Sequence, residues 1–453
     1  MDRRTFLKNT ALLSGVLAAR PWAALGDTLG GALPGTGVSR TSKLGASAGL
    51  SLLTTDLHNH SLISGDADGD PGDAYRQMRA KGLDVAVLTE HAISGKHHGE
   101  LTCPGHVKGG CHMVEGINET DWQTMKYLAD IANDPGSFVT FRSFEYSTPT
   151  VGHVNVYFSQ QFTDALHEHA FFTPPAAAEL DRVIPGTDPV VDNFALLPDI
   201  AQMRFFWEWL ASAPDREILG GGNDGIACFN HPGEFGDFAG FAYDEAAGPL
   251  VVLCEAINAE RDFFWFEVDQ GRPNPLNACL NAGWHVGFTG VSDEHSTEYA
   301  KDGLARGGLW ATGLTREAVR AAMISRHSFA TLEHGLRLDV TANGVPMGSA
   351  LTNPGTAQIA LDLDRGTGWV GKELVVEVIK PGESAATLAD SHVVTVPAPE
   401  SGPLELETDV SGDRWMFLRI TDPQRSPDAN ATGAHIENGG AVAYASPWFF
   451  DSV

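Results

Sequence analysis

Residues 52–60 read Leu-Leu-Thr-Thr-Asp-Leu-His-Asn-His, a short apolar run that ends on two histidines. Side chains alternate between the two faces of an extended strand, so His58 and His60 point to the same side. Two neutral imidazole nitrogens on one face can bind a divalent metal ion. This stretch therefore predicts a strand that carries a metal-binding pair to its carboxyl end.

The pattern of a short apolar strand followed by an amphipathic helix repeats along the next 280 residues. Pro71 begins one such helix, with Ala74, Met78 and Leu83 on its buried side. Strands are predicted at 84–88, 138–144, 154–158, 226–230, 250–257 and 285–290, and helices at 122–133, 201–212, 275–282 and 316–325. This alternation predicts an α/β fold, and in a closed α/β barrel the functional residues gather at the carboxyl ends of the strands.

Several of these strands do end on a histidine or a carboxylate. The motifs are Thr89-Glu90-His91, Phe144-Glu145, Asn230-His231 and Ser292-Asp293-Glu294-His295, and Gly152-His153 directly precedes the predicted strand at 154–158. A lone His-x-His is more often a surface or core pair than a metal site. Ordered motifs that all lie at strand ends favour one shared site instead.

In this order the motifs resemble the polymerase and histidinol phosphatase (PHP) superfamily of metal-dependent hydrolases, whose fold is a distorted, TIM-like (β/α)7 barrel. The resemblance covers residues 54–331 and implies nine metal ligands: His58, His60, Asp66, His91, Glu145, His153, His231, Asp293 and His295. By analogy, His58, His60, Glu145 and Asp293 hold one metal. Asp66, His91 and His295 hold a second, and His153 and His231 a third that Glu145 bridges. Because Gly65 departs from the usual motif, Asp68 and Asp70 are alternatives to Asp66.

The resemblance also implies a reaction on a small-molecule ester. Two or three divalent metal ions, with Zn, Mn and Fe all suiting these ligands, lower the pKa of a bridging water, so that hydroxide is the nucleophile. The implied catalytic residues are Glu145, Asp293 and His231. Glu255 and Asn258, at the end of a predicted strand, are candidates for orienting the ligands.

Three functions are consistent with this site. A phosphoesterase is favoured, and a carbamate or carboxylic ester hydrolase, as in the carbaryl-hydrolase-like branch, is the alternative, because the same hydroxide can attack carbon or phosphorus. A non-catalytic metal-containing binding protein is the third. The net charge of −28 opposes binding to nucleic acids or anionic membranes.

The two ends of the chain differ from its middle. Arg3-Arg4, the apolar stretch 11–19 and Ala23-Ala24-Leu25-Gly26 are typical of a twin-arginine export signal and too short to span a membrane. They predict a periplasmic or secreted protein. After residue 335, short strands at 358–363, 374–380, 392–396, 404–408 and 415–421 predict an antiparallel β-sandwich. The predicted division is a signal peptide at 1–26, a linker at 27–50, the barrel at 51–335 and the sandwich at 336–453.

The five cysteines fall into two groups. Cys103 and Cys111 lie in one loop rich in glycine and histidine and can pair in an oxidising compartment. Cys228, Cys254 and Cys279 lie in apolar segments, which predicts buried, inert thiols.

Overall fold

The computed structural model describes residues 31–93, 116–148, 150–165, 199–217, 220–266, 268–382 and 390–451. The strands of the first two thirds are β1 (Ser51–Asp56), β2 (Val85–Ala86), β3 (His91–Ala92), β4 (Ser143–Ser147), β5 (His153–Tyr157), β6 (Ile226–Asn230), β7 (Val251–Asn258), β8 (Arg261–Asp262), β9 (Gly287–Val291), β10 (Arg306–Ala311) and β11 (Ser328–Thr331). The helices are α2 (Pro71–Ala80), α4 (Glu119–Ala132), α6 (Asp199–Ala211), α7 (Phe238–Phe241), α8 (Pro275–Asn281), α9 (Arg316–Ser325) and α10 (His435–Asn438), with 3-10 turns at Gly45–Ser47, Val268–Gln270 and Thr367–Trp369.

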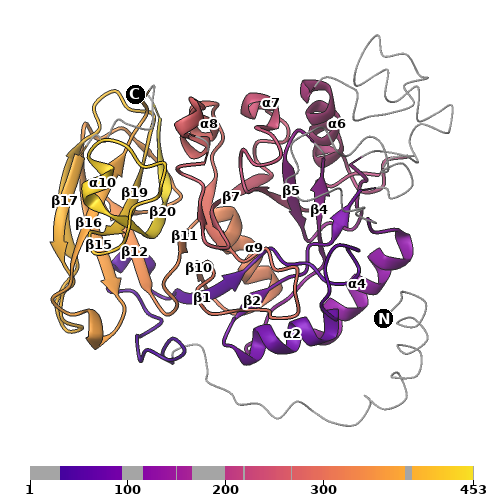
Figure 1. Cartoon of the computed structure of the whole chain (residues 1–453), viewed down its shortest axis with the longest axis horizontal. Coiled ribbons are helices and arrows are strands. Elements are labelled where there is room, and N and C mark those ends of the chain that lie inside the picture. The colour runs from indigo at the N-terminus through magenta and orange to yellow at the C-terminus, as the bar shows by residue number, and fades with distance from the viewer. Residues whose placement is uncertain are drawn as a thin grey trace.

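The described residues of the last third of the chain form strands, one 3-10 turn and one short helix. The strands are β12 (Arg337–Ala342), β13 (Val345–Pro346), β14 (Ala350–Thr352), β15 (Thr356–Asp364), β16 (Glu373–Ile379), β17 (Asp390–Thr395), β18 (Leu404–Asp409), β19 (Trp415–Asp422) and β20 (Gly440–Asp451). Figure 1 shows these strands gathered on one side of the molecule, with α2, α4 and α6 on the other. The chain is a mixed α/β protein, as predicted.

Three sheets connect these strands. The largest has the order β17-β16-β19-β20-β11-β10-β1-β2 with β14 beside β20, and the smallest has the order β13-β12-β15-β18. The third runs β3-β4-β5-β6-β7-β8, with β9 beside β7. The alternation of strands and helices does not give parallel pairing throughout, because β10 pairs antiparallel with β1, and β5 pairs antiparallel with both β4 and β6.

The first and third sheets meet at two isolated bridges, Asn59 to Glu294 and Val85 to Val139. Within the described residues the ladders do not close into one continuous ring, so the closed seven-stranded barrel stays a prediction. The bridge at Val139 also explains a shifted strand. In the predicted strand at 138–144, Phe138 and Val139 form only isolated bridges, to Asp134 and Val85. The ladder of β4 begins at Ser143, and the residues before it bury Phe138 and Phe141.

Local signals set the helix ends. Asp70 caps α2 by accepting from the Asp73 amide, and Pro71 occupies the first turn. The side chain of Asn118 accepts from the amides of Thr120 and Asp121, so α4 begins three residues before its predicted start. These caps fix the helices that cover the sheet on the side of the predicted ligands.

The C-terminal sheets enclose a common apolar core. One cluster of buried side chains joins Leu338 of β12 and Leu361 of β15 to Val376 of β16 and Leu418 of β19. Two sheets packed face to face in this way are the arrangement expected of a sandwich. However, β11 pairs with β20, with Phe329 opposite Ala445, so the ladder crosses the predicted domain boundary at residue 336.

Residues 31–50 are more ordered than the linker that we predicted. Leu33 and Val38 are buried in the same C-terminal core. The Arg40 guanidinium donates to both carboxylate oxygens of Asp84, at 2.6 and 3.1 Å. Apolar side chains spaced too irregularly to predict an element nevertheless hold this segment against both parts of the fold.

Other predictions fall partly outside the described residues. The export signal and the pair Cys103 and Cys111 lie there, whereas Cys228, Cys254 and Cys279 are buried free thiols, as predicted. Across the described parts of the chain, no helix combines the length and the apolar composition needed to cross a membrane.

Candidate metal centre

Polar side chains from six strands or the loops after them meet at one end of the α/β sheets. The predicted ligands are placed as follows: His58 and His60 after β1, Asp66 in the next loop, His91 in β3, Glu145 in β4, His153 in β5, His231 after β6, and Asp293 and His295 after β9. Each of the nine has a nitrogen or oxygen within 4 Å of another member of the set. The structure therefore brings all nine together.

Four side chains form the tightest group. The Nε2 atoms of His58 and His60 are 3.0 Å apart. His58 Nε2 lies 3.3 Å from Glu145 Oε1 and 3.2 Å from Asp293 Oδ1, and His60 Nε2 lies 3.4 Å from Asp293 Oδ1. Ligand atoms about 2.0–2.2 Å from one tetrahedral ion are about 3.3–3.6 Å apart. Of the four predicted ligands of the first metal, His58, His60 and Asp293 form one compact group, and Glu145 lies beside His58 in an adjoining group with His231.

A second group surrounds His60. Its ring lies between those of His91 and His295, with centroids 4.2 Å away on each side, and ligand atoms of the three histidines lie within 4.8 Å of one another. Asp66 Oδ2 is 3.2 Å from His91 Nε2 and 3.7 Å from His295 Nε2. The compact group here is His60, His91 and His295, which shares His60 with the first group. Asp66, the third predicted ligand of the second metal, lies beside His91 and His295 but is in none of the compact groups among the described residues.

Asp66 is the acidic side chain of its loop that contacts these histidines. Of the two alternatives, Asp70 caps α2 and Asp68 is exposed. The geometry therefore favours Asp66 for the ligand role.

The predicted third pair is arranged differently. His231 groups with His58 and Glu145, and its Nε2 lies 3.4 Å from Glu145 Oε1. His153 Nδ1 lies 3.1 Å from Glu145 Oε1, but its Nε2 lies 3.1 Å from the main-chain oxygen of Thr148. Because that contact occupies one ring nitrogen, His153 offers only Nδ1 to the cluster. It belongs to none of the compact groups among the described residues.

Glu255 and Asn258 form hydrogen bonds that orient the candidate ligands, as the sequence suggested. Glu255 Oε1 is 2.7 Å from His58 Nδ1, and Oε2 accepts from the His231 amide at 2.7 Å. Asn258 Nδ2 donates to Glu255 Oε2 at 2.9 Å and to Asp293 Oδ2 at 3.1 Å. A carboxylate on Nδ1 of a histidine leaves Nε2 free to bind a metal ion.

Serine hydroxyls support the other histidines, and sequence reasoning missed them. Ser64 Oγ lies 3.1 Å from His60 Nδ1 and donates to the buried carboxylate of Glu90 at 2.6 Å. Ser147 Oγ lies 2.7 Å from His91 Nδ1. Ser147 follows Glu145 by two residues in β4, so the period of the strand was a usable signal for it.

Two ligands sit on strained backbone. His231 and Asp293 have φ values of 23° and 51°, in the left-handed region that L residues rarely adopt. Both come directly after a buried strand, where the turn directs the side chain back over the end of the sheet. Such conformations persist where the surrounding contacts determine them, and they cluster at functional sites.

The electrostatics of the cluster suit a cation. Burial raises the pKa of Asp293, but the charge of His58 and the close approach of His60 outweigh it, so the pKa falls well below the usual value. Burial lowers the pKa of His91, but the charge of Glu145 outweighs it and raises the pKa to about 10. Burial and the charges of His91 and His295 lower the pKa of His60 to about 3. The carboxylates are thus ionised and His60 is a neutral donor.

Buried polar atoms without a hydrogen-bond partner also indicate a site for a cation. Asp66 Oδ1, His231 Nδ1 and Asp293 Oδ1 are buried and have no hydrogen-bond partner. Most buried polar atoms have one. Asp293 Oδ1 belongs to the tight group of four, where a bound cation would supply the missing partner. Imidazole and carboxylate donors fit Zn²⁺, Mn²⁺ or Fe²⁺.

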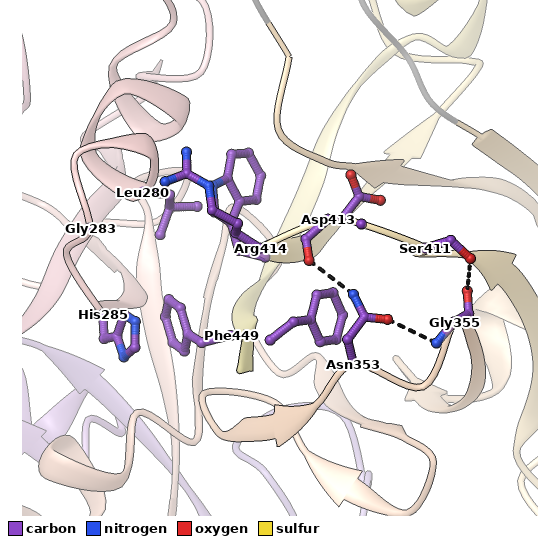
Figure 2. A pocket seen from close by; sticks show the side chains of 12 residues that line it. Leu280, Gly283, His285, Asn353, Gly355, Ser411, Asp413, Arg414 and Phe449 are labelled. Carbon is purple, nitrogen blue, oxygen red and sulfur yellow. Dashed lines mark hydrogen bonds between the residues drawn. The ribbon is translucent and has the colours of Figure 1, made fainter. Parts of the chain in front are cut away.

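A separate crevice of about 610 Å³ lies where α8 faces the turns of the C-terminal sheets (Figure 2). His285, Arg414 and Phe449 line it, and Asn353 donates to the main-chain oxygen of Asp413 beside it. The residues that line this crevice include none of the nine predicted ligands. It is therefore distinct from the metal centre.

Comparisons with known proteins gave distant structural similarities, of which two are described here. No protein-family model matches the chain, and no curated protein sequence matches it. A two-domain protein from Bacteroides vulgatus containing a predicted PHP-like metal-dependent phosphoesterase aligns over 89% of this chain and 97% of its own, with 12% identity and a TM-score of 0.38. Histidinol phosphate phosphatase from Lactococcus lactis, solved with zinc, L-histidinol and phosphate, aligns over 54% of this chain and 86% of its own, with 14% identity and a TM-score of 0.24. The first is named for the domain type that the ordered motifs resemble. At these TM-scores neither similarity carries an argument, so the function rests on the geometry.

Proposed function

We propose that this chain is a metal-dependent phosphoesterase of the PHP type that acts on a small-molecule ester. The observation that carries the proposal is the group of His58, His60, Glu145 and Asp293, whose ligand atoms lie 3.0–3.4 Å apart in four of their pairings. When bound there, divalent metal ions would polarise the phosphoryl group and make a nearby water more acidic.

The side chains of the site then have distinct roles. In hydrolysis a bond forms between the water oxygen and phosphorus, the bond from phosphorus to the ester oxygen breaks, and the proton lost by water ends on the departing alcohol. We assign the ionised Asp293 carboxylate to take and pass on that proton. Glu145 contacts His58, His91, His153 and His231 and fixes the positions of their rings relative to one another. His231 lies against Glu145, with its Nε2 atom 3.4 Å from Glu145 Oε1.

A cationic side chain at the site favours a phosphoester over a neutral ester. The Arg261 guanidinium, 44% exposed, pairs with Glu234 and donates to Asn258 Oδ1 at 3.3 Å. Asn258 in turn contacts the candidate ligand Asp293. Arg261 is thus connected to the ligand Asp293 through Asn258, and an arginine at this position can bind a phosphoryl oxygen of the substrate. A carbamate or carboxylic ester, which carries no such charge, is the second candidate.

The test is hydrolysis of p-nitrophenyl phosphate, bis-p-nitrophenyl phosphate and p-nitrophenyl acetate by protein loaded with Mn²⁺, Zn²⁺ or Fe²⁺. We expect the wild type to favour a phosphate ester and Asp293→Ala and His58→Ala to lose at least 100-fold in kcat/KM. His285→Ala, an exposed histidine of the separate crevice, is the matched control and should retain activity. Equal turnover in wild type and the two site variants would exclude this mechanism. Turnover of the acetate alone would support the second candidate.

We also propose that the protein is exported through the twin-arginine route and acts in the periplasm or outside the cell. Arg3-Arg4 and the short apolar stretch after it support this. Fractionation of cells expressing the chain with Arg3→Lys and Arg4→Lys would test it. The double variant should stay in the cytoplasm, and unchanged export would contradict the proposal.

A further inference from the structure

Phe235 is an exposed aromatic side chain beside the candidate ligands. It is 40% exposed, although the chain buries most of its phenylalanines. Its ring stacks on that of His153 at 4.4 Å between centroids with planes 1° apart, and it meets the ring of His231 edge-on at 5.2 Å. One face of the phenyl ring therefore covers a ligand-cluster histidine, and the rest of the ring remains open.

The loop that carries Phe235 is held in place. The Gly233 amide donates to the Gly236 carbonyl at 3.1 Å, and the Glu234 amide donates to the His231 carbonyl at 3.1 Å. Gly236 has a φ of 136°, and a Cβ atom there would lie 2.3 Å from the Thr150 main-chain oxygen. Because the turn directly follows His231, the phenyl ring is fixed relative to the ligand cluster before any substrate binds.

Such a ring has a use in recognition. A substrate whose phosphoryl group contacts the side of the cluster formed by His153 and His231 has its remaining atoms close to the ring of Phe235. A flat, unsaturated group gains more from a fixed phenyl face than a short alkyl group does, because it buries more apolar area and stacks in a favourable geometry. Exposed apolar side chains at a site mark ligand contacts more often than isolated surface residues do.

We propose that Phe235 selects aryl esters, with the aromatic leaving group of the substrate stacked on its open face. This inference rests on the proposed function, since it assigns the substrate class of the same site. It makes Phe235 a specificity-determining residue that takes no part in proton transfer.

The test compares two non-hydrolysable probes, phenylphosphonate and methylphosphonate, by isothermal titration calorimetry on the metal-loaded full chain. We expect wild type to bind phenylphosphonate about tenfold more tightly, and Phe235→Ala to lose that preference while its affinity for methylphosphonate changes less than twofold. Phe235→Trp should restore the preference. Tyr127→Ala, which removes another exposed aromatic ring, on α4, is the matched control and should behave as wild type.

A structural role for Phe235 predicts different results. Metal content by plasma mass spectrometry should be the same in Phe235→Ala and wild type, and a loss of metal with equal weakening of both probes would overturn the inference. A phenyl preference that survives in Phe235→Ala would also overturn it, while leaving the phosphoesterase proposal intact. A wild type that binds neither probe and hydrolyses no ester would overturn the phosphoesterase proposal, and this inference with it.

Discussion

Replacing Glu255 by glutamine should weaken metal binding without touching a ligand. The carboxylate is fully buried and faces three donors, at His58 Nδ1, the His231 amide and Asn258 Nδ2. A glutamine amide has one oxygen and one NH₂ group, so at least one of the three donors would face another donor. If the NH₂ group faces His58, the imidazole must carry its proton on Nε2, which then cannot bind a metal ion.

The expected size of this effect follows from the hydrogen bond that the substitution removes behind His58. Loss of a partner behind a metal-binding histidine costs about 10- to 100-fold in metal affinity, or about 1.4 to 2.8 kcal/mol. One unsatisfied buried donor costs about 1–3 kcal/mol, which agrees with that range. Both routes give the same order of magnitude, so a change well outside it would need another cause.

The assay is metal release into a colorimetric chelator at graded concentrations, read together with metal content after dialysis. Glu255→Gln should release its metal at a chelator concentration about 10- to 100-fold lower than wild type. Glu377→Gln, which alters an equally buried carboxylate in the C-terminal sheets, is the matched control and should release metal as wild type does. Identical release curves for Glu255→Gln and wild type would refute the reasoning.

Three further outcomes are expected. Removing metal with a chelator should lower the melting temperature measured by calorimetry. An ion that binds the folded but not the unfolded state stabilises the fold by about 2.7 kcal/mol when its free concentration is 100 times Kd. An unchanged melting temperature would contradict binding at the site. Gly236→Ala should destabilise the chain in urea titration and displace the ring of Phe235, since φ is 136° and the added Cβ would lie 2.3 Å from the Thr150 oxygen; wild-type stability would show that the turn can relax. Burial raises the pKa of Glu377, but the hydrogen bond from His435 and the charge of Arg419 outweigh burial, so the net pKa is lowered. The ionised carboxylate therefore stabilises the fold at neutral pH, and this contribution is lost as the pH falls below about 4.3. The gap in melting temperature between wild type and Glu377→Gln should therefore narrow from pH 6 to pH 3, and the exposed Glu405→Gln should show no such gap.

Local patterns were sufficient to predict the elements that carry the site. Strand β6 and helix α9 have their predicted bounds, because an apolar run between turn residues and a capped amphipathic segment are local signals. The set of nine ligands was implied by the resemblance of the ordered motifs to the PHP superfamily, and the structure brings all nine side chains together.

The pairing of the strands depends on contacts distant in sequence and was predicted less well. Nothing near β5 indicates that it runs antiparallel to β4 and β6, and nothing near Phe329 indicates that β11 pairs with β20 across the predicted boundary. Phe235 was missed for a similar reason. Its role follows from the ring of His153, 82 positions earlier in the chain, and from a turn fixed by Gly233 and Gly236.

The central claim is that the four closest ligand atoms surround a metal ion. Anomalous scattering from a crystal of metal-loaded protein, recorded at the absorption edge of the metal, tests it directly. We predict a peak about 2.0–2.2 Å from His58 Nε2, His60 Nε2 and Asp293 Oδ1, with Glu145 as the fourth ligand. A crystal without a peak there, in which His58 and His60 instead share a hydrogen bond, would contradict the account.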